Sequence, residues 1–231
     1  MRYGYVERAK FIIRHNRFIA EVQTESGDTT RIHVKNTGRC RELLLPGVTV
    51  YIEKAAGSSR KTPYDLIAVE KETERGTVLV NIDSQAPNKA AAEWLKGGLF
   101  STSAILRPEV KYGNSRFDFY VEDGDKKAFV EVKGVTLEVN GAILFPDAPT
   151  ERGVKHLGEL CHVMKEGYEA YVLFVVQMSG AKSFSPNRKT HPEFADALKK
   201  ARDCGVRVLV YECDVKADEM KITKQIKEII I

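Results

Sequence analysis

Six short stretches rich in β-branched and aromatic residues follow one another at the start of the chain, and this spacing limits the fold more than any other feature. They cover residues 9–13, 17–24, 29–35, 48–55, 65–72 and 77–83, and each is bounded by Gly, Asn, Asp or Pro. Short strands at this density favour closure into a small barrel, because closure leaves no exposed sheet edge. We therefore expect an OB-like β-barrel over residues 1–86.

The pattern changes after Pro87, where helices begin to alternate with strands. We expect helices at residues 88–96, 150–167 and 192–204, and strands at residues 105–111, 115–122, 127–137, 169–178 and 207–213. Residues 179–191 are interpreted as a polar loop. This order predicts a second, α/β domain over residues 87–231.

The helix at residues 150–167 has a predicted start, stop and apolar face. Thr150 is a suitable N-cap and Gly167 a suitable stop. Four apolar residues recur at helical spacing: Val154, Leu157, Cys161 and Met164. We expect this face to lie on a sheet.

The composition permits many partners and excludes a few classes of protein. Lys and Arg number 36 against 32 Asp and Glu, so the net charge of +4 allows a polyanionic partner without requiring one. A hydrophobic fraction of 43% is enough for a core and argues against disorder. Because we find neither a signal-peptide pattern nor an apolar run long enough for a membrane span, we expect a cytoplasmic protein with no membrane partner. The four cysteines are expected to be reduced thiols.

Two carboxylates and a lysine lie on neighbouring predicted strands. Glu131 and Lys133 are two apart, so the strand period directs both side chains to one face. Asp118 lies on the preceding strand, and the turn at residues 123–125 lets the two strands pair as a hairpin. We therefore expect Asp118 to stand beside Glu131.

Carboxylates that converge in this way suit Mg²⁺ or Mn²⁺, with further coordination positions left for water and phosphate oxygens. Lys133 would orient the attacking water or help to deprotonate it. The alternative is a solvated strand face, because the same acidic-x-Lys pattern begins at Glu109, Asp125, Asp214 and Glu219. What distinguishes Glu131 is its apolar strand, the Asp on the strand before it, and the helices that precede and follow.

The order of elements and the residues RFDF at 116–119 and EVK at 131–133 resemble the PD-(D/E)xK nuclease superfamily. A wider set of motifs resembles the sugar fermentation stimulation protein A (SfsA) family. These motifs are NTGR at 36–39, LLPG at 44–47, RFDF at 116–119, VEVKGVTL at 130–137, FPDAPTERGVKHLGEL at 145–160 and SFSPN at 183–187. The resemblance implies a DNA-binding protein with an OB-fold, followed by a restriction-endonuclease-like mixed sheet flanked by helices. It also implies a link to the control of sugar catabolism.

The superfamily resemblance suggests further residues for the site. Glu93, on the first helix of the second domain, would be an additional carboxylate, although a solvent-facing Glu is an equal alternative. Arg152 and Lys155, near a helix start, are candidate phosphate contacts. His156 is a candidate proton carrier, although a lone helical His is more often structural or solvated. Val154 stands where relatives tend to have Gln, which weakens the case for a specific catalytic group on this helix.

Candidate DNA contacts are basic and polar residues near the NTGR segment and in the late polar loop. They are Arg31, Lys35, Asn36, Thr37 and Arg39, with Asn187 and Arg188. The alternative for the NTGR segment is a polar barrel loop without a ligand. Phe11, Phe18 and Tyr51 are each candidates for base stacking or for the barrel core.

Two functions therefore compete. The first is a Mg²⁺- or Mn²⁺-dependent deoxyribonuclease that uses Asp118, Glu131 and Lys133. The second is a non-specific DNA-binding regulator whose nuclease-like site is catalytically silent. A small-molecule enzyme of sugar metabolism is disfavoured, because the chain lacks P-loop, Rossmann, HExxH and GxSxG motifs. The sequence leaves the oligomeric state open.

Overall fold

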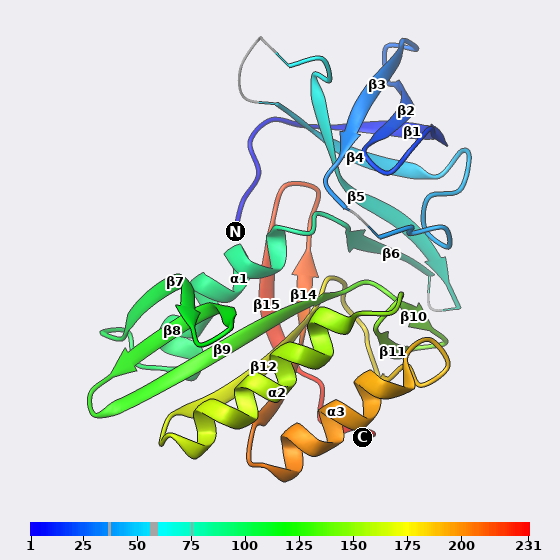
Figure 1. Ribbon diagram of the computed structural model, residues 1–231. Helices are drawn as coiled ribbons and strands as arrows, with labels where there is room; N and C mark the ends of the chain where they lie inside the picture. Colours follow the sequence, from blue (N-terminus) through cyan, green and yellow to red (C-terminus); the bar gives the residue numbers. More distant parts are fainter. Residues whose placement is uncertain (37, 56–59, 75) are drawn as a thin grey trace. The chain divides into compact units, whose positions relative to one another are not determined.

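The computed structural model describes residues 1–36, 38–55, 60–74 and 76–231, which divide into two units (Figure 1). The first unit comprises Met1–Ala86, Gln177–Ser179 and Cys213–Lys221. The second comprises Pro87–Val176, Gly180–Glu212 and Ile222–Ile231. The two late segments of the first unit fall inside the range that the sequence analysis gave to the second domain.

The first unit contains the predicted barrel. Its strands are β1 (Val6–Arg14), β2 (Ile19–Thr24), β3 (Thr29–Val34), β4 (Thr49–Lys54), β5 (Tyr64–Thr73) and β6 (Gly76–Asn81). They are ordered β3-β2-β1-β4-β5-β6, and a parallel pairing between β3 and β5 closes five of them into a ring. Alternate residues of β2 fill the interior, since Ala20 and Val22 have no solvent exposure, whereas β5 is buried continuously from Asp65 to Val69. The OB-like barrel is thus confirmed.

Segments distant in the sequence complete this unit. The Nε2 amide of Gln177 donates hydrogen bonds to the backbone oxygens of Asn81 and Asp83, at 3.0 and 3.1 Å. The backbone N–H of Tyr3 donates to the oxygen of Asp218, at 2.8 Å. Buried polar groups at the end of β6 therefore have partners that short-range sequence patterns do not reveal.

The second unit is built on a mixed sheet. Its elements are α1 (Ala86–Trp94), a π-helical turn (Leu95–Leu99), β7 (Ile105–Tyr112), β8 (Ser115–Asp123), β9 (Lys126–Val135), α2 (Glu151–Lys165), β12 (Glu169–Val176), α3 (Pro192–Asp203), β14 (Arg207–Val215) and β15 (Met220–Gln225). The strand order is β15-β14-β12-β9-β8-β7. Strands β7, β8 and β9 are antiparallel, whereas β9, β12 and β14 are parallel. Helix α2 packs on β12 and beside α3 (Figure 1). This agrees with the predicted mixed sheet flanked by helices.

A smaller sheet corrects one sequence prediction. It contains β10 (Glu138–Val139), β11 (Ala142–Phe145), β13 (Ser183–Pro186) and β16 (Glu228–Ile229). Residues 183–186 were expected to be loop, yet they pair in parallel with β11. Phe184 is fully buried, and its ring centroid lies 4.5 Å from that of Phe174. Phe184 and Pro186 are buried, and pairing with both β11 and β16 holds this largely polar segment in the sheet.

Helix α2 begins and ends as predicted, but its buried face is rotated. The Oγ1 atom of Thr150 accepts a hydrogen bond from the N–H of Gly153, at 3.1 Å, and Gly167 has a φ of 91°. The buried residues of α2 are Gly153, His156, Leu157, Leu160, Cys161 and Val163. The predicted face residues Val154 and Met164 are only half-buried. None of the helices in the described ranges is long and apolar enough to span a membrane.

Candidate functional site

The regular pairing of β8 with β9 ends at Phe119, the residue that follows Asp118 in the sequence. It runs from Asp123 opposite Lys126 to Phe119 opposite Val130. On the other side of β8, Glu109 of β7 has a left-handed φ of 55°. An irregularity of this kind redirects side chains and often occurs beside active sites.

Two aromatic rings of β8 contact the same ring of β9. Phe117 and Tyr120 each place their ring centroid 5.0 Å from that of Phe129 on β9. Residues three apart on a regular strand point to opposite faces. Both rings nevertheless reach Phe129, while burial alternates along β8 from Ser115 to Val121 and β7 pairs with β8 in one register.

Asp118 is held by two hydrogen bonds. Its Oδ1 atom accepts from the Nδ2 amide of Asn88 at 2.8 Å, and its Oδ2 atom accepts from the backbone N–H of Val132 at 2.7 Å. Burial, followed by the negative charge of Glu131, raises the pKa of Asp118 in spite of these bonds. The carboxylate is thus oriented while its charge is disfavoured.

Glu131 is 3% exposed and has one satisfied and one unsatisfied oxygen. Its Oε1 atom accepts a hydrogen bond from the Lys133 ammonium at 2.6 Å and is also in close contact with Nδ1 of His156. Within the described residues, its buried Oε2 atom has no hydrogen-bond partner. Burial alone would raise the pKa of Glu131, but the His156 and Lys133 contacts outweigh it and lower the pKa. The group is therefore kept as a carboxylate.

His156 connects Glu131 to Arg152 on the first turns of α2. The Nε atom of Arg152 donates to Nε2 of His156 at 3.3 Å. Because the Arg152 Nε–H can only donate, Nε2 of His156 is the acceptor in this contact, and Nδ1 is the ring nitrogen that faces Glu131. The Arg152 side chain is otherwise on the exposed side of the helix. This arrangement fixes the Glu131 carboxylate through a histidine.

The residues present fit a divalent cation bound by two carboxylates. The buried Oε2 atom of Glu131 has no hydrogen-bond donor among the described residues, and the neighbouring Asp118 has a raised pKa. A bound cation would stabilise both carboxylates. In the described part of the chain, no group of three or more His, Cys, Asp or Glu side chains is arranged to hold a metal ion. Mg²⁺ commonly uses only one or two carboxylates and takes water and phosphate oxygens for the rest.

Glu93 does not join this pair. It is exposed on α1, and the α1 residue that contacts Asp118 is Asn88. Five helical residues correspond to a rotation of about 140° beyond a full turn, so Asn88 and Glu93 point in different directions. The expectation of a third carboxylate from Glu93 is therefore replaced by an amide from Asn88.

Other candidates on the second unit contact its own surface. The Nζ atom of Lys155 donates to the backbone oxygen of Asn114 at 2.7 Å. The side-chain amide of Asn187 donates to the oxygen of Pro146 at 3.1 Å, and Arg188 pairs with Asp196 at 2.8 Å. These contacts give Asn187 a structural role in the loop, and leave Lys155 and Arg188 exposed.

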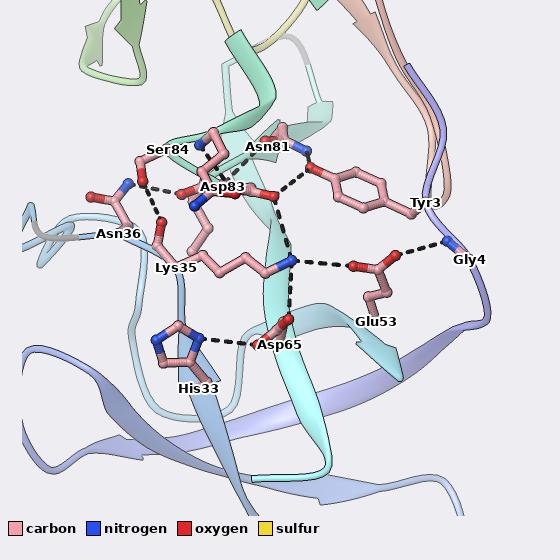
Figure 2. Close-up of polar contacts among 12 residues, drawn as sticks. Tyr3, Gly4, His33, Lys35, Asn36, Glu53, Asp65, Asn81, Asp83 and Ser84 are labelled. Atoms are coloured by element: carbon pink, nitrogen blue, oxygen red, sulfur yellow. Dashed lines mark hydrogen bonds and ion pairs between the residues drawn. The ribbon is translucent and has the colours of Figure 1, made fainter. Parts of the chain in front are cut away.

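Lys35 lies in a network of carboxylates in the first unit (Figure 2). Its ammonium is 3.0 Å from Asp65, 3.3 Å from Glu53 and 3.8 Å from Asp83. Three carboxylates balance the positive charge of the Lys35 ammonium. Its side chain therefore holds the barrel together and is not available to contact a phosphate. Asn36 is likewise structural, because its Nδ2 amide donates to the oxygen of Ile82 at 2.8 Å.

The remaining predicted contacts of the barrel differ in exposure. Arg31 is on the surface of β3, 4.0 Å from Glu21. Arg39 is exposed. Thr37 lies outside the described residues. Among the aromatic candidates, Phe11 is core at 2% exposure, whereas Phe18 is 50% exposed. The Tyr51 hydroxyl donates to Glu70 at 2.9 Å.

Sequence reasoning missed Asn88 and undervalued His156. Asn88 carries no motif, and its contact with Asp118 spans 30 positions of the chain. His156 carried a usable signal, since it lies on the same helical face as the buried residues Leu160 and Val163. A histidine among apolar neighbours on the sheet-facing side needs a polar partner, and Glu131 is that partner.

Comparison with known proteins agrees with both units. Residues 12–82 match the SfsA N-terminal OB domain, and residues 85–219 match the sugar fermentation stimulation protein RE domain. Sugar fermentation stimulation protein homologs from Ruminiclostridium cellulolyticum and Clostridium beijerinckii are each 52% identical to this chain. The first alignment covers 98% of this chain and 99% of the relative, and the second covers 100% of both.

A solved structure shows the same arrangement of elements. SfsA from Pyrococcus furiosus, in complex with Ca²⁺, is 26% identical, with a TM-score of 0.86 over 100% of this chain and 98% of that chain. The fold therefore defines a protein in which an OB domain precedes an RE domain. The chain belongs to the sugar fermentation stimulation protein (SfsA) family.

Proposed function

We propose that this protein binds DNA and hydrolyses its phosphodiester bonds with Mg²⁺ or Mn²⁺ held by Asp118 and Glu131. The observation that carries the proposal is the buried Oε2 atom of Glu131, which has no hydrogen-bond donor among the described residues. A cation would supply its missing partner and offset the burial and the repulsion by Glu131 that raise the pKa of Asp118. The PD-(D/E)xK resemblance of the surrounding motifs supports phosphodiester hydrolysis as the chemistry.

The Pyrococcus furiosus relative supports a divalent cation in this chain. That protein was solved in complex with Ca²⁺. Ca²⁺ and Mg²⁺ both prefer oxygen ligands, and Mg²⁺ is the smaller ion with the stricter geometry. Two carboxylates on adjacent strands are the oxygen ligands that this chain offers.

The remaining side chains divide the work of hydrolysis. When bound, the cation would place positive charge at the scissile phosphate. Lys133, whose side chain is 16% exposed, would donate a hydrogen bond that orients the attacking water. The water oxygen forms a bond to phosphorus and releases a proton to solvent, one ester P–O bond breaks, and the departing oxygen takes up a proton from solvent. His156 acts as a positioning residue through Glu131, and Arg152 provides a cation for an adjacent phosphate.

One observation favours the competing function. The site offers two carboxylates without a third acidic ligand among the described residues, and Lys133 is directed at Glu131. Such a site could bind a cation and DNA without turnover. The competing function is thus a non-specific DNA-binding regulator, and only the family name connects it with sugar catabolism.

DNA cleavage separates the two functions. Plasmid and labelled single-stranded DNA would be incubated with purified protein in Mg²⁺, in Mn²⁺ or in EDTA. We expect Glu131→Gln and Lys133→Ala each to lower the cleavage rate by at least about 100-fold. Asp214→Asn, an exposed member of another acidic-x-Lys pair, is the matched control and should cut like the wild type. If the wild type does not cut, or if all the variants cut equally, the nuclease proposal is wrong.

A further inference from the structure

Four arginines surround one cavity of the barrel unit. The cavity has a volume of about 420 Å³ and is lined by Arg14, Asn16, Arg17, Arg39, Arg41 and Leu44. Its walls come from the end of β1, the turn that leads into β2 and the segment between β3 and β4. Few sites in a protein of net charge +4 gather this much positive charge.

Arg14 fixes the walls of the cavity. Its guanidinium donates to five backbone oxygens, at distances from 2.7 to 3.2 Å. These oxygens belong to Asn16, Arg17, Asn36, Gly38 and Arg39. One side chain therefore holds the β1–β2 turn and the later segment in a defined geometry before any ligand arrives.

The other three arginines have no carboxylate partner within the part of the chain that the structure describes. Most arginines of the described residues lie within 4.0 Å of a carboxylate oxygen: Arg2, Arg8, Arg31, Arg60, Arg107, Arg116, Arg188, Arg202 and Arg207. Within the same part of the chain, the exceptions are the four cavity arginines and Arg152. Among the described residues, guanidinium groups without a carboxylate within 4.0 Å thus occur only at this cavity and at the candidate nuclease site.

An exposed aromatic ring adjoins the cavity in the sequence. Phe18 follows Arg17 and is 50% exposed. Its backbone N–H donates to Oδ1 of Asn16 at 2.8 Å, so the turn that carries the ring is held in place. A basic surface next to an exposed aromatic side chain is the combination that binds a single strand, because phosphates meet the cations and bases stack on the ring.

We infer that Arg17, Arg39 and Arg41 bind a phosphate group of single-stranded DNA, with Phe18 stacking on a neighbouring base. The guanidinium fork matches phosphate oxygens, and no carboxylate has to be displaced first. This inference rests on the proposed function only in taking DNA as the ligand. The phosphate comes either from an internal phosphodiester or from the phosphorylated end of a strand.

Fluorescence anisotropy with a labelled 12-nucleotide single strand tests the inference. All measurements are made in EDTA, so binding is separated from cleavage. The double variant Arg39→Ala/Arg41→Ala should lower affinity at least tenfold and reduce the slope of log affinity against log salt by about 0.7, the value for one phosphate contact on a single strand. Phe18→Ala should lower affinity several-fold with the slope unchanged, because it removes stacking and no charge. Arg8→Ala, which loses an arginine paired with Glu70, is the matched control and should bind normally.

Two further measurements identify the source of the phosphate and show that a loss of affinity does not come from misfolding. The double variant Arg39→Lys/Arg41→Lys keeps the charge but loses the fork, so it should keep the salt slope and lose several-fold in affinity. Oligonucleotides with a 5′-phosphate and a 5′-hydroxyl distinguish the source. If the 5′-phosphate oligonucleotide binds more tightly than the 5′-hydroxyl one, and inorganic phosphate competes with it, the cavity binds strand ends. If the two oligonucleotides bind equally, the cavity binds internal phosphodiesters.

The results separate this inference from the nuclease proposal. If the Arg39→Ala/Arg41→Ala protein unfolds thermally like the wild type and binds the strand equally well, the cavity does not bind DNA, even if Glu131 proves catalytic. If the wild type cuts no DNA but this variant loses affinity, the cavity site stands and the nuclease proposal fails. Absence of single-strand binding by the wild type overturns the inference outright.

Discussion

At the scale of single residues, substitution of His156 tests whether this histidine positions the Glu131 carboxylate. Removing its contact with Oε1 leaves the carboxylate held by Lys133 alone. Outer partners of metal-binding carboxylates typically contribute 10- to 100-fold in metal affinity, so we expect His156→Ala to weaken Mn²⁺ binding by about this factor. Titration calorimetry measures the change in Mn²⁺ affinity.

His162→Ala, on an exposed face of the same helix, is the control and should bind Mn²⁺ like the wild type. Unchanged affinity in both variants would exclude a positioning role for His156.

Asp65 gives a prediction for stability against pH. Burial would raise its pKa, but hydrogen bonds from Arg60, Lys35 and His33 outweigh this effect and lower the pKa to about 2. A carboxylate with a lowered folded-state pKa contributes stability above its unfolded value, and that stability is lost as pH falls through the folded value. The contribution is about 2 kcal/mol, lost between about pH 4 and pH 2.

The Asp65→Asn variant removes this contribution. We expect its free energy of unfolding at pH 7 to fall by about 2–3 kcal/mol, because two cations lose a buried partner. Its stability should also depend less on pH between about pH 4 and 2 than that of the wild type. Denaturant unfolding across this range provides the measurement, with the exposed Asp28→Asn as the control. A variant that unfolds like the wild type at every pH would contradict the structural role of the network in Figure 2.

At the scale of elements, two glycines on helix α2 should respond in opposite ways to alanine. A Cβ atom at Gly153 would lie 2.9 Å from both Cγ2 and Oγ1 of Thr150 and 3.1 Å from Phe194. A Cβ atom at Gly158 would meet nothing within 4 Å. The first change displaces the capping side chain, whereas the second only improves helix propensity.

We therefore expect Gly153→Ala to destabilise the protein by about 1–2 kcal/mol, and Gly158→Ala to stabilise it by about 0.5–1 kcal/mol. Chemical denaturation under identical conditions compares the two. Because Arg152 and His156 lie on the same first turns, Gly153→Ala should also weaken Mn²⁺ binding. Equal and favourable effects of both substitutions would show that the N-terminus of α2 is not packed as described.

The elements that the sequence predicted share a strong local signal. The barrel strands are rich in β-branched and aromatic residues and end at turn-forming residues, and α2 has both a capping threonine and a glycine stop, so local chemistry determines them. Residues 183–186 were missed because pairing with β11 and β16 holds this largely polar segment in a sheet. The end of the β8–β9 pairing beside Asp118 was not predicted, because the alternation of residues along one strand does not show where its pairing with the next strand stops.

At the scale of the whole molecule, the sequence predicted both folds but not every partner at the site. Asp118, Glu131 and Lys133 were predicted to lie together from strand period and element order, and they do lie in one region of the sheet. Asn88 and the Arg152–His156 pair complete that region through packing of helices on the sheet, which sequence spacing does not specify. The same limit explains Lys35, which appeared to be a surface cation and is neutralised by three carboxylates from other segments.

The position of a bound divalent ion tests the central claim most directly. Crystals of the wild type and of Glu131→Gln would be soaked in Mn²⁺, and the ion located by its anomalous scattering. We expect one ion in the wild type with oxygen ligands from both Asp118 and Glu131, at about 2.0–2.2 Å, and its loss in the variant. No ion at these carboxylates, or an ion that remains unchanged in Glu131→Gln, would contradict the assignment of the metal site.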